Sequence, residues 1–243
     1  WFPRRGLYDI ATLFAGTVVV AGIAMLVAAP LGLGSAVYLS EYATPRTRRF
    51  LKPVLEVLAG IPSVVLGFFA LTFITPTVLK PIFGDGIAGF NMLAAGIGVG
   101  ILTIPLVASV TEDALRSVPR ALREASYALG ASRMATSVRV VVPAAVSGVV
   151  ASLILAFSRA VGETMVVAIA AGATGGSLFS VDPLTNGQTM TAAMAALAIG
   201  SDRVRGDDYA FQSLFFLGLL LFMVTLTLNM VSERFVRRVR QKY

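Results

Sequence analysis

The sequence predicts an all-α polytopic membrane protein, and three observations support this fold class. First, 56% of the 243 residues are hydrophobic and only 14% are charged, so a soluble domain could not cover this much apolar surface. Second, five apolar stretches are long enough to cross about 30 Å of hydrocarbon at about 1.5 Å per residue. Third, no apolar stretch alternates with a period of two over ten residues, which favours helices over a barrel.

These five stretches define the expected spans in chain order. They run over Ala11–Leu39, Phe50–Ile74, Met92–Val110, Pro143–Ala171 and Phe211–Val231. Around them the chain divides into an external segment 1–10, a membrane domain 11–233 and a basic tail 234–243. The membrane domain contains a polar segment, 111–142. The apolar segment 188–200 is too short to span, and we expect it to form a re-entrant or surface helix.

Lysine and arginine residues set the expected orientation. Fourteen lie in segments 40–52 and 111–142 and in the tail, against five on the other side of the membrane. The positive-inside rule therefore places segment 111–142 and the C-terminus in the cytoplasm and residue 1 outside. Five spans with an external start predict a sixth, N-terminal helix before residue 1. Arg4 and Arg5, on the outer side, fit the rule poorly.

Composition excludes several classes of function. The chain has no Cys and no His, so disulfides, the usual zinc or haem sites and a histidine pH switch are not expected. The net charge of +7 lies in short blocks beside the apolar helices, which argues against nucleic-acid binding. The lysines of the chain, Lys52, Lys80 and Lys242, lie outside any glycine-rich loop of the kind that binds the phosphates of ATP. We therefore expect no catalytic residue, metal site or bound cofactor in this chain.

Small residues predict where the helices pack closely, because membrane helices associate through close approach rather than through exclusion of water. The fourth span places one at every fourth position: Ala144, Gly148, Ser152, Ala156, Ala160, Thr164, Ala168 and Gly172. Shorter rows occur in the first span at Ala28, Gly32 and Ala36, and in the third span at Gly96 and Gly100.

Arg159 and Glu163 are charged residues within the fourth span. An ionised side chain there costs at least about 2.5 kcal/mol, so it normally faces a polar interior or a partner. Spaced four apart, the two side chains are expected one turn apart on one helical face. The guanidinium either offers its donors to an oxyanion in a protein-lined path, with Glu163 holding it in place, or forms a merely structural ion pair. In the second span, Pro62 breaks the helical ladder and either opens backbone groups to a cavity or only kinks the helix.

The polar segment 111–142 is predicted to form two short helices on either side of a glycine. One begins near Pro119 and runs from Arg120 to Leu129, and Gly130 supplies a left-handed stop. A second helix is expected from Arg133 to Val142. This elbow either docks into a groove of another protein, with Tyr127 and Leu129 as apolar anchors, or lies as an amphipathic linker on anionic lipid.

Within this segment the chain resembles the EAA loop of ABC-importer permeases. Glu124, Ala125, Gly130 and Pro143 keep the spacing of that motif, and Ser126 replaces its second Ala. Segments 59–67, 117–125 and 158–165 resemble the permeases of the phosphate-specific (Pst) ABC importer. The continuation 165–172 is more like its C subunit than its A subunit.

The resemblance implies the type I ABC importer transmembrane domain (MetI-like) in the inner membrane. It implies a second homologous permease, two ATPase subunits that bind ATP and Mg²⁺, and an external phosphate-binding protein as partners. It places the ATPase contact at Glu124, Ala125, Ser126, Tyr127, Leu129 and Gly130. It places the phosphate path at Arg159, Glu163, Thr164 and Ser63.

Three alternatives remain open from the residues alone. An arginine suits sulfate, molybdate or a carboxylate almost as well as phosphate. A channel or an ion-coupled secondary transporter could use Arg159 and Glu163 as ion or proton ligands, although no inverted repeat is visible. A membrane scaffold that moves nothing would leave the intramembrane arginine unexplained.

Overall fold

The computed structural model describes residues 1, 3, 6–172, 179–199 and 208–239, and within these ranges every regular element is a helix. The principal helices are α1 (Ile10–Val37), α2 (Pro45–Ala59), α3 (Ser63–Phe69), α4 (Lys80–Phe83), α5 (Met92–Arg116), α6 (Arg120–Ala128), α7 (Arg133–Thr136), α8 (Val142–Ala144), α9 (Val146–Val161), α10 (Met165–Ala170), α11 (Met190–Ile199) and α12 (Asp208–Val239). Tyr38–Tyr42, Ala70–Leu79 and Ser137–Val141 are π-helical, and Gly84–Gly86 is a 3₁₀ turn. The prediction of an all-α fold is confirmed.

Four helices in the described part of the chain are long and apolar enough to cross a membrane: Ile10–Tyr42, Ser63–Phe83, Met92–Arg116 and Tyr209–Arg234. A fifth is counted if Arg133–Ala144 and Val146–Val161, which meet at 71°, form one span. The first, third and fifth expected spans therefore match helices. Residues 240–243 of the expected basic tail lie outside the described residues.

The second expected span, Phe50–Ile74, is wrong in its limits. The chain makes two helices there: α2 ends at Ala59, and α3 begins at Ser63 after Pro62 adopts an extended backbone conformation (φ −58°, ψ 132°). The helical run that begins with α3 continues to Phe83 through residues expected to form a loop. Pro62 lacks a backbone N–H and disfavours a helical conformation at the residue before it, so the interruption is a full break rather than a kink.

The fourth expected span, Pro143–Ala171, is not one continuous helix. It bends sharply at Ala145, where α9 begins, and α9 ends at Val161 before Gly162. The short helix α10 follows from Met165. Two breaks thus divide a stretch that hydropathy alone presents as a single span.

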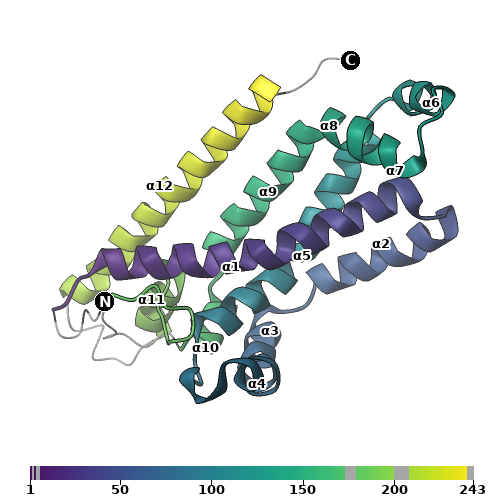
Figure 1. Cartoon of the computed structure of the whole chain (residues 1–243). Coiled ribbons are helices and arrows are strands. Elements are labelled where there is room, and N and C mark those ends of the chain that lie inside the picture. The colour runs from purple at the N-terminus through teal and green to yellow at the C-terminus, as the bar shows by residue number, and fades with distance from the viewer. Residues whose placement is uncertain (2, 4–5, 173–178, 200–207, 240–243) are drawn as a thin grey trace.

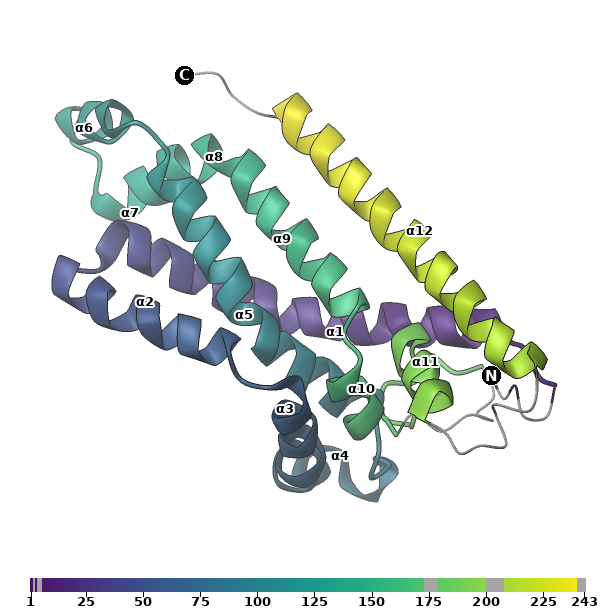
Figure 2. The same cartoon turned by 180° about the vertical axis from the view of Figure 1, so that it is seen from behind.

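Helix α5 lies at the centre of the helix bundle, in contact with α1, α2 and α9 (Figure 2). Its glycines allow close approach to α1, since a Cβ added at Gly96 would lie 2.6 Å from the Ile23 Cβ. Gly148 on α9 similarly faces the Ala114 methyl of α5, and the hydroxyls of Thr111 and Ser152 lie 2.7 Å apart. The predicted small-residue rows of α1 and α5 are confirmed as packing surfaces, and so is the row of α9 as far as Ala160; its last three members, Thr164, Ala168 and Gly172, lie beyond the end of α9 at Val161.

The two ends of the helix bundle are formed by different helices. Helices α6 and α7 and the C-terminal end of α12 lie at one end, and α4, α10, α11 and the N-terminus lie at the other (Figure 1). The short helix α11 packs into this second end, with Met190 and Ala193 fully buried. Its first backbone N–H donates to the Thr17 hydroxyl of α1 at 3.1 Å, so α11 is not a surface helix.

Candidate functional site

A cavity of about 210 Å³ lies between α2, α5 and α9. Residues from Leu102 to Glu112 of α5 form one wall, which corresponds to about 15 Å along that helix. The wall is largely apolar, and the polar side chains that line the cavity are Lys52, Glu56, Ser109, Glu112 and Arg159. The cavity therefore runs along α5 between largely apolar walls that carry few charged side chains.

Arg159 is the only lining residue from α9. Its side chain is exposed, and within the described part of the chain it forms no ion pair or side-chain hydrogen bond. A guanidinium without a protein partner presents its full set of donors to whatever enters the cavity. The donors of Arg159 are therefore available to a ligand in the cavity.

The expected pairing of Arg159 with Glu163 is wrong. The two residues are not on one helix, because α9 ends at Val161. The Glu163 carboxylate instead accepts hydrogen bonds from the backbone N–H groups of Met165 and Val166, at 3.2 and 3.3 Å. It caps the N-terminus of α10, where a negative charge is favourable.

Thr164 and Ser63 lie beside the two helix breaks. The Thr164 hydroxyl donates to the Gly162 carbonyl at 3.3 Å, and Ser63 begins α3. Helices α3 and α10 pack together, since a Cβ added at Gly67 would lie 3.0 Å from the Ile169 Cβ. Neither Thr164 nor Ser63 lines the cavity that holds Arg159, so the structure brings the breaks together but leaves these residues beyond the cavity.

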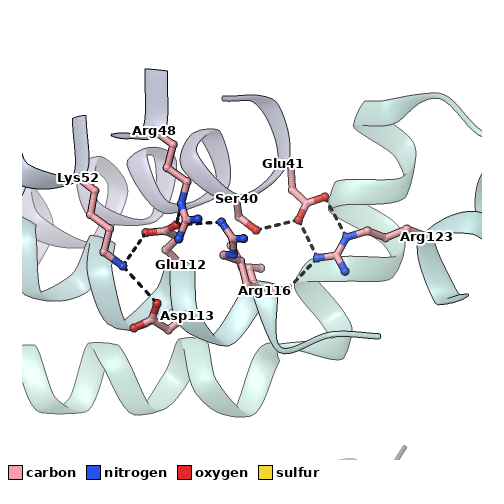
Figure 3. Close-up of polar contacts among 9 residues, drawn as sticks. Ser40, Glu41, Arg48, Lys52, Glu112, Asp113, Arg116 and Arg123 are labelled. Carbon is pink, nitrogen blue, oxygen red and sulfur yellow. Dashed lines mark hydrogen bonds and ion pairs between the residues drawn. The ribbon is translucent and has the colours of Figure 1, made fainter. Parts of the chain in front are cut away.

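Glu112 is the best-connected carboxylate at this site, and it was not among the predicted residues. It is 1% exposed and accepts a hydrogen bond from the Arg48 Nε at 2.5 Å. The Lys52 Nζ and the Arg116 Nη1 lie 3.7 and 3.8 Å from its oxygens (Figure 3). The pairs with Arg48 and Lys52 tie α2 to α5, whereas the pair with Arg116 lies within α5. The available signal was an acidic residue at the charged end of an otherwise apolar span, with Arg116 four residues later.

Glu41 and Arg123 form a second pair that sequence reasoning missed. The Arg123 guanidinium donates to both Glu41 oxygens, at 2.9 and 3.3 Å, and to the carbonyls of Leu115 and Val118, at 2.8 and 2.7 Å. Figure 3 shows this arginine reaching from α6 to the segment that follows α1. Arg123 therefore positions the start of α6 against the ends of α1 and α5.

The predicted helix–glycine–helix elbow is confirmed. Helix α6 ends at Ala128, Gly130 has a φ of +80°, and α7 begins at Arg133 with Ser132 as its N-cap. The Ser126 hydroxyl lies 2.9 Å from that of Thr136 and joins the two arms.

The outer surface of this elbow is not covered by the described part of the chain. The side chain of Leu129 is 90% exposed and that of Tyr127 is 42% exposed. Glu124 and Ala125 are also exposed on α6. Of the six predicted contact residues, only Ser126 is directed mainly into the elbow itself.

Comparison with known proteins gives matches across the chain. The family described as "Binding-protein-dependent transport system inner membrane component" matches residues 28–243. The phosphate transport system permease protein PstC of Mesorhizobium japonicum is 32% identical over 259 residues, which cover 98% of this chain and 76% of that protein. PstC 1 of Mycobacterium tuberculosis is 34% identical over 256 residues, covering 98% and 75%.

Other relatives match in part. The probable ABC transporter permease protein YqgH of Bacillus subtilis is 38% identical over 167 residues, which cover 69% of this chain and 53% of that protein. This chain thus spans about half of YqgH and about three quarters of the PstC proteins.

Solved structures show the same arrangement of helices. An inward-facing form of the MetNI methionine ABC transporter has a TM-score of 0.67 at 20% identity, covering 95% of this chain and 94% of that chain. A bacterial ABC transporter that imports the polysaccharide alginate has a TM-score of 0.68 at 14% identity, covering 96% and 82%. At these identities the likeness concerns the fold, which agrees with the prediction of a type I importer transmembrane domain.

Proposed function

The chain belongs to the family of binding-protein-dependent transport system inner membrane components, and from this premise we propose that it is the permease subunit of an ATP-driven phosphate importer. It is a multi-pass inner membrane subunit of an ABC transporter. The proposed substrate, inorganic phosphate, is supported by the names of the PstC relatives and by the chemistry of the cavity. PstC is also the better match to the chain over its length, since the related PstA 1 of Mycobacterium tuberculosis covers 65% of it.

The unpaired guanidinium of Arg159 is the observation that carries the proposal. It lines a cavity whose walls are otherwise mostly apolar, and it is exposed to a ligand that enters the cavity. An arginine fork matches two oxygens of a phosphate, and such charge-assisted bonds are among the strongest hydrogen bonds in proteins.

The path is proposed to continue from Arg159 to the two helix breaks. Glu163, Thr164 and Ser63 lie there, where interrupted helices leave backbone polar groups that a cavity-lining segment can tolerate. In the other direction, Lys52 lines the cavity and is held by Glu112 and Asp113. The proposed path thus carries one unpaired cation, Arg159, the carboxylate of Glu56, and a cation, Lys52, that Glu112 and Asp113 neutralise.

The elbow at the end of α5 is proposed to receive the ATPase subunit. Exposed Leu129 and Tyr127 supply apolar anchors, and Glu124, Ala125, Ser126 and Gly130 complete the contact. ATP and Mg²⁺ would be bound by the two ATPase subunits. This end of the bundle and the C-terminus would face the cytoplasm, and a phosphate-binding protein would deliver substrate to the opposite end. A second, homologous permease would complete the path.

The test of the path is uptake of radiolabelled phosphate by proteoliposomes that contain the complete transporter. We expect Arg159→Ala to lower uptake by about a hundredfold, because the charge-assisted bonds between the guanidinium and the anion are lost. Arg139→Ala, which removes an exposed arginine outside the cavity, should leave uptake unchanged. Normal uptake by Arg159→Ala would contradict the proposed path, and uptake without ATP under an ion gradient would favour a secondary transporter.

The test of coupling is Leu129→Asp. Because Leu129 is almost fully exposed in this chain, the substitution should not change thermal unfolding of the permease in detergent. It should weaken association with the ATPase and reduce phosphate-stimulated ATP hydrolysis at least about tenfold, since a central apolar anchor is lost. Leu7→Asp, at an exposed leucine before α1, is the matched control. Unaltered ATPase association would exclude Leu129 from the contact.

A further inference from the structure

A second cavity, of about 360 Å³, lies where four helical segments meet beside the elbow. Its walls come from the segment after α1, the start of α2, the end of α5 and the start of α6. It shares no lining residue with the cavity of Arg159. Four arginines line it, namely Arg48, Arg116, Arg120 and Arg123, together with Ser40. This cavity is not used by the proposed path.

The charges around this basic cavity do not balance. Two carboxylates face its arginines: Glu41 pairs with Arg123, and Glu112 pairs with both Arg48 and Arg116. Glu112 is also shared with Lys52. Two guanidinium charges therefore remain in excess among the four arginines, and the cavity attracts anions.

Three of the four arginines also have donors to spare. Arg123 directs its Nε and both Nη atoms to Glu41 and to backbone carbonyls. Arg48, by contrast, is bonded through its Nε alone, and the Arg116 Nη1 lies 3.8 Å from Glu112, beyond hydrogen-bond distance. Arg120 has no side-chain hydrogen bond or ion pair in the described part of the chain.

We propose that this basic cavity binds a phosphate group. Three guanidinium forks with free donors, carried by α2, α5 and α6, surround one recess, and a phosphate offers several acceptor oxygens where a carboxylate offers two. Free inorganic phosphate and the headgroup of an anionic phospholipid both carry this group. Basic recesses between membrane helices are suited to such headgroups. The site is argued from its own charges and does not depend on the substrate of the transporter.

A phosphate group bound here would link three elements that otherwise meet through Glu112 and Glu41. It would contact α2 through Arg48, α5 through Arg116 and the elbow through Arg120. The mutual repulsion of the arginines around the cavity would then be neutralised. Binding should therefore stabilise the junction between α2 and the elbow.

Binding to the full chain in detergent tests the proposal, in an Arg159→Gln background that removes the cation of the path. One arm measures radiolabelled inorganic phosphate by equilibrium dialysis. The other counts phosphatidylglycerol molecules retained by native mass spectrometry after reconstitution with a mixture of phosphatidylglycerol and phosphatidylcholine. We expect Arg120→Gln to weaken binding of the bound probe about tenfold, because bonds to one charged donor are lost. Arg116→Gln should act in the same direction.

Arg139→Gln provides the matched control, since it removes an exposed arginine at the same end of the helix bundle but outside the cavity. Binding that survives Arg139→Gln and falls in Arg120→Gln supports the site, and the arm in which this occurs identifies the source of the phosphate. An equal fall in both variants, or no saturable binding of either probe, overturns it. Loss of ATPase association in Arg120→Gln with neither probe bound would assign the cavity to an acidic protein partner instead.

Discussion

Helices α1 and α2 both pack against α5, yet they are held there by different forces. Helix α1 packs directly against α5 through small and aliphatic residues, which leave no space between the two helices. Helix α2 meets it through ion pairs beside a cavity. One face of α5 is therefore a fixed contact, and the other is a contact that water, ions or a substrate can enter.

The contact between α1 and α5 depends on glycine residues, whose lack of a side chain lets the two helices approach closely. A Cβ added at Gly32 would lie 2.6 Å from the Val107 Cβ, and one added at Gly100 would lie 2.8 Å from the Val27 Cβ. Ala28 is fully buried in the same interface, in a cluster with Val107 and Ala156. Dispersion contacts at this separation are many and short-ranged, so a small displacement loses a large part of them.

The α2 contact has none of these features. No residue of α2 is buried over its fully described length, and Phe50 and Val57 are each 71% exposed in this chain. Arg48 and Lys52 connect the helix to Glu112 and Asp113. Ion pairs weaken gradually with distance, so α2 can shift relative to α5 at lower cost than α1 can. We infer that α2 is the wall of the cavity that moves.

The largest expected effect on stability comes from disrupting the packing of α1 against α5. Gly32→Val should destabilise the protein by about 3 kcal/mol, because the new side chain would overlap Val107 and the Ile104 carbonyl. Thermal unfolding of the purified chain in detergent measures this. Gly34→Val is the matched control on the same helix, since nothing lies within 4 Å of the added Cβ. Equal destabilisation by both variants would mean that helix propensity, not packing against α5, determines the result.

A smaller effect on stability is expected at the contact between α2 and α5. Glu112→Gln should destabilise by about 1–2 kcal/mol, because Arg48, Lys52 and Arg116 lose their shared counter-charge. The cost stays moderate since these cations are 28–45% exposed and water can solvate them.

The neighbouring residue offers the control for that experiment. Asp113 is 66% exposed and lies 3.6 Å from the same Lys52, so Asp113→Asn should cost less than about 0.5 kcal/mol. Unfolding in urea with the two variants side by side would show the difference. If Asp113→Asn proved the more costly, the burial of Glu112 would not be what holds α2 to α5.

The contact with α1 could be predicted from sequence, because rows of Gly and Ala at four-residue spacing act locally and report directly on close packing. The elbow could also be predicted, since Pro119 and Gly130 fix its start and its turn through backbone geometry alone. Hydropathy, in contrast, merged α2 with α3 and α9 with α10. It measures the polarity of side chains and is insensitive to the φ and ψ angles that end a helix at Gly60–Pro62 or at Gly162.

The partners of charged residues were harder to predict. Glu112 and Arg48 are 64 residues apart in sequence, and no local pattern indicates that they meet. Glu163 and Arg159 are four apart, but the break after Val161 turns the carboxylate toward the N–H groups of α10. Helical spacing identifies neighbours only when the helix continues between them. Arg159 was singled out because the cost of a charge in an apolar span does not depend on any partner, and its role in the path stays a prediction.

Apart from the control variants, the smallest expected effect on stability concerns Glu163, where the close-packed part of the protein meets the proposed path. Glu163→Ala should destabilise by about 1 kcal/mol, since two N–H groups of α10 lose their acceptor. Glu163→Gln keeps an acceptor oxygen and should retain most of that stability, while removing the charge. We expect phosphate uptake to fall in both variants, because the charge beside the helix break belongs to the proposed path. Uptake that falls only in Glu163→Ala, in step with its thermal unfolding, would make Glu163 a cap of α10 and remove it from the path.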